Sequence, residues 1–126
     1  MKGADTFKLV GVADRDTWVV LTDPDQNTDQ ILIVSFTSFT PGIGMDASCV
    51  VETNEYLILT NRSCIYYEDI KELSLANLET LSKAGRLQKR TPVPAELLQR
   101  IRDGAMISDE CREKHKELLI KQGLIT

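Results

Sequence analysis

Ile31-Leu32-Ile33-Val34-Ser35-Phe36 carries the clearest structural signal in this chain. An apolar run of this length, rich in β-branched residues, is typical of a central strand that is buried on both faces. Thr40-Pro41-Gly42-Ile43-Gly44 follows closely, and we expect residues 37–46 to form a loop. The run is far shorter than the roughly 20 residues that cross a bilayer. The sequence therefore predicts no membrane span.

Shorter strand-like segments flank this run on both sides. They are rich in β-branched and aromatic residues, and clusters of Gly, Pro, Asn and Asp separate several of them. Short, closely spaced strands favour a sandwich or a barrel. We therefore expect a compact β-barrel over about residues 5–73. Besides the central strand, its predicted strands lie at residues 7–10, 18–21, 49–51, 56–59 and 63–67.

Beyond the predicted barrel, apolar residues recur at helical spacing. Ser74 is a suitable N-cap for a first short helix, and Gly85 is suited to the position just after its end. Pro94 is a helix opener, and the sequence predicts a second helix over residues 95–103 that Gly104 ends. Both helices are expected to pack against the barrel.

A third helix is predicted over residues 109–122, and it would bury one apolar stripe. The chain of 126 residues suits one domain, with a helical part over about residues 74–126. The only histidine lies on this stripe, where packing against the barrel is favoured over acid–base catalysis. The stripe consists of Cys111, His115, Leu118 and Leu119.

Charge is distributed unevenly along the chain. Residues 1–85 hold six Lys and Arg against thirteen Asp and Glu, whereas residues 86–126 hold nine against six. The acidic part would repel phosphate backbones, whose binding depends on Lys and Arg. The densest basic stretch is either a solvated face or a phosphate-binding surface. It contains Arg86, Lys89, Arg90, Arg100 and Arg102.

The sequence offers no pattern for a metal or a cofactor. Cys49, Cys64 and Cys111 are odd in number and lack Cys-x-x-Cys spacing, so we expect reduced thiols, the first two buried. A phosphate-binding glycine loop, a metal-ligand cluster and a Ser-His-Asp order are not recognisable. The N-terminal sequence lacks the features of a secretory signal, so the expected location is the cytoplasm.

Five places in the chain carry a recognisable pattern: Arg15-Asp16-Thr17-Trp18-Val19-Val20-Leu21-Thr22, Ile33-Val34-Ser35-Phe36-Thr37-Ser38, Leu59-Thr60-Asn61-Arg62-Ser63-Cys64-Ile65, Leu78 and Ala84-Gly85-Arg86-Leu87. In their order and spacing they resemble motifs of the PemK/MazF family of toxin endoribonucleases. The resemblance covers roughly residues 5–105. It implies a small SH3-like β-barrel with a few helices, metal-independent cleavage of single-stranded RNA, a homodimer and an antitoxin-like protein partner.

The resemblance also implies site residues. An Arg before the second strand and a Thr or Ser after the third are implicated in the family, and the matching residues are Arg15, Thr37 and Ser38. Arg15 falls one position from the family's Arg, where this chain has Asp16, whose carboxylate would repel a phosphate. The candidate RNA-binding residues are Arg62, Arg86, Lys89 and Arg90.

Each candidate also has a purely structural interpretation. Hydroxyl residues at the end of a strand, such as Thr37 and Ser38, commonly satisfy backbone groups. Arg15 in an acidic turn is commonly a solvated charge. The alternative to an endoribonuclease is therefore a non-catalytic SH3-like barrel that serves as a protein-binding module, because one fold hosts many functions.

Overall fold

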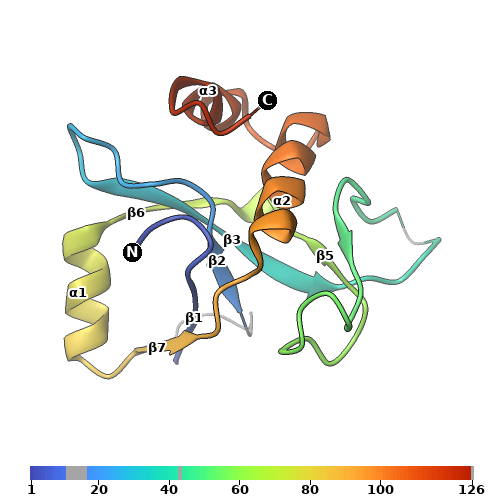
Figure 1. Cartoon of the computed structure of the whole chain (residues 1–126), viewed down its shortest axis with the longest axis horizontal. Helices are drawn as coiled ribbons and strands as arrows, with labels where there is room; N and C mark the ends of the chain where they lie inside the picture. The colour runs from blue at the N-terminus through green and yellow to red at the C-terminus, as the bar shows by residue number, and fades with distance from the viewer. Residues whose placement is uncertain (11–16, 43, 126) are drawn as a thin grey trace.

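The structure, a computed structural model, describes residues 1–10, 17–42 and 44–125, and in these residues seven strands form an antiparallel, open sheet accompanied by three α-helices (Figure 1). The strands are β1 (Thr6–Leu9), β2 (Trp18–Val20), β3 (Gln30–Ser38), β4 (Val50–Val51), β5 (Ser63–Ile65), β6 (Lys71–Ser74) and β7 (Leu87–Arg90). The helices are α1 (Leu75–Lys83), α2 (Ala95–Ile107) and α3 (Glu113–Lys121), and a 3-10 turn, η1, spans Tyr67–Asp69. In the described part of the chain, no helix is long and apolar enough to cross a membrane.

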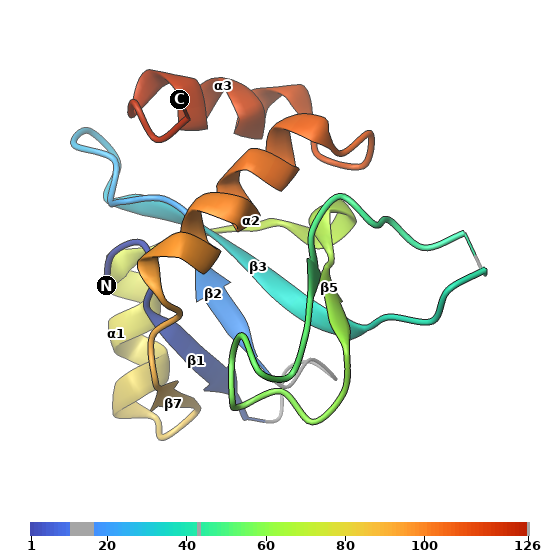
Figure 2. The same ribbon diagram turned by 45° about the vertical axis from the view of Figure 1, so that its right-hand side comes forward.

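Strand β3 is the centre of the sheet. Its first half pairs with β6, its middle pairs with β2, and its last residues pair with β5. Figure 2 shows β3 between β2 and β5. The strand order β4-β5-β3-β2-β1-β7 ends at β4 and β7 without closing. The structure is therefore a mixed α/β fold, with which the predicted mainly β fold with C-terminal helices is consistent, whereas a closed barrel over residues 5–73 is not confirmed.

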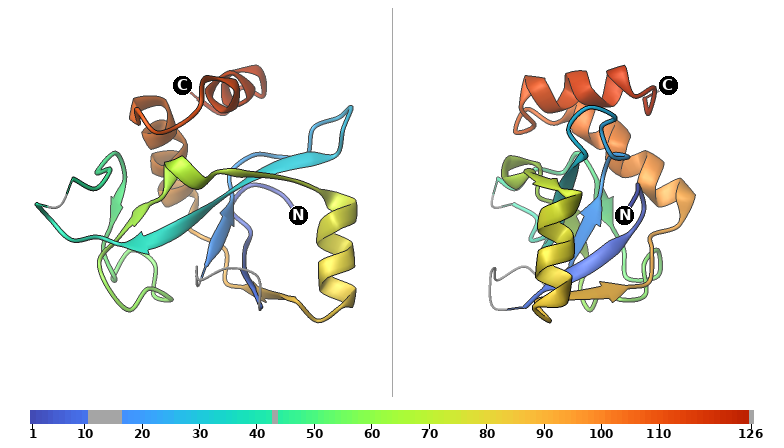
Figure 3. Two further views of the ribbon diagram at one scale, coloured as in Figure 1. Left: turned by 180° about the vertical axis from the view of Figure 1, so that it is seen from behind. Right: turned by 90° about the vertical axis from the view of Figure 1, so that its left-hand side faces the viewer.

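Alternate side chains of β3 enter two separate hydrophobic cores, because successive residues of a strand point to opposite faces. Leu32, Val34 and Phe36 belong to a core that α2 and α3 cover, with Ile101 and Leu119 among its members. Ile31 and Ile33 enter a second core, which Leu78 on α1 helps to close. Figure 3 shows α1 lying apart from α2 and α3. The prediction of a strand buried on both faces is confirmed.

Some strand predictions differ from the structure. Thr37 and Ser38 extend β3, so the predicted loop begins after them. Residues 56–59 are not a strand, because they form a turn in which the Leu59 N–H donates to the Tyr56 carbonyl at 3.0 Å. The Tyr56 ring stacks on Phe36, with 5.6 Å between the ring centroids. The strands β6 and β7 were not predicted, because their mostly polar, exposed residues lack an apolar alternation.

The helix boundaries differ for a packing reason. Gly104 does not end α2, which continues to Ile107. A Cβ atom at position 104 would lie 2.3 Å from the Tyr67 hydroxyl oxygen, so the glycine serves the close approach of α2 to η1. The last helix begins at Glu113 rather than at residue 109, because Ser108 caps the C-terminal end of α2 and bonds to Asp46.

Helix α3 is part of the fold rather than a free tail. Its buried residues are His115 and Leu119, whereas Leu118 is only half-buried. Cys111, the other buried member of the predicted stripe, lies just before the helix. His115 packs with 3% of its surface exposed, and its Nε2 atom lies 3.0 Å from Oε1 of Glu72 on β6. The imidazole therefore links the last helix to the sheet, in agreement with its expected packing role.

The two neighbouring leucines of α3 should differ in their contribution to stability. Leu119→Ala should lower the free energy of unfolding by about 2–5 kcal/mol, the usual cost of emptying a buried leucine site. Leu118→Ala should cost clearly less, because Leu118 already contacts solvent. Urea unfolding of both variants measures the difference. Equal losses would contradict this placement of α3.

The burial of His115 predicts a pH dependence of stability. Burial lowers the pKa of the imidazole below its ordinary value, although the hydrogen bond to Glu72 acts in the opposite direction. The unfolded chain then binds the proton more readily than the folded chain, so stability is highest above about pH 6.5, the ordinary pKa of the imidazole, and declines as the pH falls below it. Urea unfolding at a series of pH values around and below 6.5 should show a shallower decline in His115→Gln. If the stability of His115→Gln falls with pH as steeply as that of the wild type, groups other than His115 cause the decline.

Candidate functional site

A polar cleft of about 400 Å³ lies where several strands end. The end of β3, the start of β5, the end of β7 and the residue before β2 all contribute to it. The lining combines hydroxyls, one amide and one guanidinium with three apolar side chains, which suits a polar ligand. The lining residues are Thr17, Phe36, Thr37, Ser38, Ile58, Leu59, Thr60, Asn61, Ser63 and Arg90.

The pairing of β3 with β5 places two serines side by side in this cleft. Ser38 and Ser63 are directly opposite each other in the ladder, so their side chains share one face of the sheet. The Ser63 hydroxyl donates a hydrogen bond of 2.9 Å to the backbone carbonyl of Asn61. Ser38 is exposed at the end of its strand. The two hydroxyls therefore form one polar edge of the cleft.

Thr37 and Ser38, the two predicted catalytic residues on β3, point to opposite faces, because they are successive residues of a strand. Thr37 pairs with Cys64, and both residues line a second hollow of about 310 Å³. Thr37 thus borders both cavities, but its side chain shares a face with Cys64 rather than with Ser38. The structure separates the two hydroxyls that the sequence had grouped.

The second hollow is acidic. Its lining includes Asp46, Glu68 and Glu110. Burial acts to raise the pKa of Asp46, but hydrogen bonds from the Ser108 and Ser48 hydroxyls and from the Ser48 N–H hold it below its ordinary value. The carboxylate is therefore ionised at neutral pH. A phosphate would be repelled on this side, so the Ser38 side of the strand is the one compatible with an anion.

Arg90 supplies the positive charge of the cleft. It pairs with Thr6 in the ladder between β7 and β1, and it is half-buried. Among the described residues, no ion pair involves Arg90. Burial raises the pKa of the neighbouring Tyr56 phenol, and the charge of Arg90 partly opposes that shift. Because no carboxylate among the described residues pairs with it, the Arg90 guanidinium is available to an anionic ligand.

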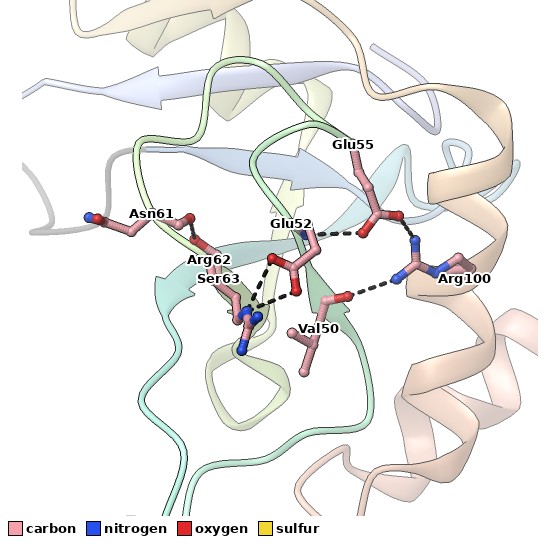
Figure 4. Close-up of polar contacts among 7 residues, drawn as sticks. All are labelled: Val50, Glu52, Glu55, Asn61, Arg62, Ser63 and Arg100. Atoms are coloured by element: carbon pink, nitrogen blue, oxygen red, sulfur yellow. Dashed lines mark hydrogen bonds and ion pairs between the residues drawn. The ribbon is translucent and has the colours of Figure 1, made fainter.

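The other predicted basic residues lie outside the cleft lining. The Nε atom of Arg62 lies 2.8 Å and 3.1 Å from the two carboxylate oxygens of Glu52, so its charge is already compensated (Figure 4). Arg86 is exposed just before β7, and Lys89 shares a face with its partner Phe7, opposite to that of Arg90. None of these three residues lines the cleft.

Arg15, the remaining predicted catalytic residue, lies outside the described residues. Thr17, two positions later in the chain, lines the cleft. The polar lining residues that sequence reasoning missed as site residues are Thr17, Thr60, Asn61 and Ser63. Ser63 stands in the segment that resembles the family's Leu-x-x-x-Ser motif, which could have drawn attention to it. Thr60 and Asn61 carry no comparable signal.

Burial raises the pKa of all three cysteine thiols. Cys49, Cys64 and Cys111 are all buried as free thiols, and burial raises the pKa of Cys49 to about 11. A thiol with such a pKa is a poor nucleophile at neutral pH. Within residues 1–10, 17–42 and 44–125, no group of three or more His, Cys, Asp or Glu side chains could hold a metal ion.

Comparison with known proteins does not assign the chain to a family. No protein-family model matches it. No curated protein is significantly similar to it in sequence.

Proposed function

We propose that this chain is a PemK/MazF-like endoribonuclease that cleaves single-stranded RNA in the cleft between the ends of β3, β5 and β7. The observation that supports the proposal is the convergence of Ser38, Ser63 and Arg90, which lie far apart in the sequence, on one cleft. A guanidinium beside hydroxyl donors suits a phosphodiester, which accepts charge-assisted hydrogen bonds. The resemblance in the sequence supplies the reaction class.

The proposal includes an SH3-like arrangement of the sheet. Strand β3 pairs with β2 and β6 along its first part and with β5 along its last residues. A long strand that passes from one group of strands to another is a common way to turn a corner in a small, orthogonally packed β-structure. This sharing of β3 supports the barrel-like part of the prediction.

The proposed reaction is an internal transfer at phosphorus. The RNA 2′-oxygen forms a bond to phosphorus, the bond from phosphorus to the 5′-oxygen breaks, and the products are a 2′,3′-cyclic phosphate and a 5′-hydroxyl. Arg90 would stabilise the charge on the phosphate oxygens, and Ser38 would orient them. The described lining residues include no carboxylate or imidazole. In the proposed reaction, water accepts the 2′-hydroxyl proton and protonates the leaving oxygen.

Cleavage of a mixed single-stranded RNA in the presence of a chelator tests this proposal. Ser38→Ala and Arg90→Ala should each slow cleavage by about tenfold or more, a floor beneath the roughly 10²–10³-fold lost when one charge-stabilising donor is removed. Thr37→Ala should have a smaller effect, because its side chain faces the acidic hollow. Ser82→Ala on α1 and Arg112→Ala before α3 are the matched controls, since both residues are exposed and lie outside the cleft lining.

Arg15→Ala belongs to the same series, because the resemblance implies a catalytic role for Arg15. It should also slow cleavage by about tenfold or more. Equal cleavage by the wild type and by the Ser38, Arg90 and Arg15 variants would assign the activity to a contaminant and contradict the proposal.

A non-catalytic protein-binding module is the second candidate. The cleft lining lacks a proton acceptor among the described residues, and Leu57, next to the lining residue Ile58, has 87% of its surface exposed. An exposed leucine at the rim suits a protein contact. A folded wild-type protein that cleaves no RNA would favour this candidate.

We also propose a homodimer and an antitoxin-like protein partner, as the resemblance implies. The open sheet ends at β4 and β7, and unpaired strand edges are commonly covered in assemblies. Light scattering should give twice the 14.1 kDa mass of one chain. The mass of a monomer across a wide range of concentrations would reject the dimer.

A further inference from the structure

Residues 52–62, which we call the wall segment, contribute Ile58, Leu59, Thr60 and Asn61 to one side of the cleft, and two ion pairs fix the segment. The carboxylate of Glu55 pairs with Arg100 on α2 (Figure 4). Arg62 pairs with Glu52, which joins the end of the segment to its beginning. The segment is therefore fixed both to a helix and to itself.

Tyr56 anchors the middle of the wall segment to the sheet. Its ring stacks on Phe36, and its hydroxyl donates to the backbone carbonyl of Thr91 at 2.5 Å and lies 3.0 Å from Oγ1 of Thr6. The side chain is buried. Because a buried aromatic ring with a satisfied hydroxyl has little freedom, the residues that follow Tyr56 are held in place although they form no helix or strand.

The residues after Tyr56 present an apolar surface and an amide to the cleft. Ile58 and Leu59 are half-buried and line the cleft, and Asn61 is exposed. The Asn61 carboxamide extends away from the ion pairs of the wall segment in Figure 4. Within the described residues, its recorded side-chain contact is one of 3.5 Å to the Thr60 hydroxyl, at the limit of a hydrogen bond. The amide is thus available to a ligand.

We propose that Asn61 is the residue that determines which nucleobase the cleft prefers; this inference rests on the proposed RNA-cleaving function. An amide carries a donor and an acceptor at a fixed separation, so it can form two hydrogen bonds to one base edge. Ile58 and Leu59 offer the base ring an apolar surface. Contacts to phosphate, such as those proposed for Arg90, carry no sequence information. Backbone binding and base selection are therefore divided between the two sides of the cleft.

Fluorescence anisotropy with labelled homopolymers of adenylate, cytidylate or uridylate tests the role of Asn61. The wild type should bind one of them more tightly than the others. Asn61→Ala should reduce the ratio between the weakest and the tightest Kd by about fivefold or more, since a bidentate base contact is worth roughly 1–3 kcal/mol. Asn61→Asp, which keeps the size but loses the donor, should reduce the ratio as well.

Two control variants separate base selection from backbone binding. Asn77→Ala, at an exposed position on α1, should leave every Kd unchanged. Arg90→Ala should weaken binding to all homopolymers alike and preserve their ratio. A wild type that binds RNA, but whose ratio survives Asn61→Ala, or that binds all homopolymers equally, would overturn the inference and leave the proposed function standing. A wild type that binds no RNA would overturn both.

Discussion

The hydrogen bonding of β3 with three different strands is the constraint on which the other elements depend. A buried strand must satisfy its N–H and C=O groups, and β3 does so with β6, β2 and β5 in turn along its 9 residues. The alternation of its side chains then requires two cores, so a helix must cover each face. The cleft begins where this strand emerges from the interior.

Much of the fold could be predicted from the sequence because burial produces visible patterns. The apolar run at residues 31–36 predicted the central strand, and helical spacing predicted α1, α2 and α3. Strands β6 and β7 escaped prediction because an exposed, largely polar strand has no apolar alternation to recognise. Gly104 was misleading because a glycine that permits close packing looks, in sequence, like a glycine that ends a helix.

The candidate site could be predicted only in part. The resemblance singled out Thr37 and Ser38, and the basic stretch included Arg90, but neither signal tells which way a side chain points. Only the ladder between β3 and β5 shows that the two hydroxyls face different cavities. Arg62 was a candidate RNA-binding residue because the sequence gives no sign that its charge is paired. Its partner, Glu52, lies ten positions away. Asn61 had no signal, because a single amide in a loop is common.

Because Thr37 and Ser38 point to opposite faces, the number of residues in this part of β3 matters more than which of the two hydroxyl residues stands at each position. A single residue inserted between Phe36 and Thr37 would exchange the two faces, because the side chains of a strand repeat with a period of two. The serine would then meet the carboxylates, and the threonine would meet Arg90. Since both residues carry a hydroxyl, a substitution between them is a small change. An odd-numbered insertion at this point would instead reverse the electrostatic surroundings of each residue in one step.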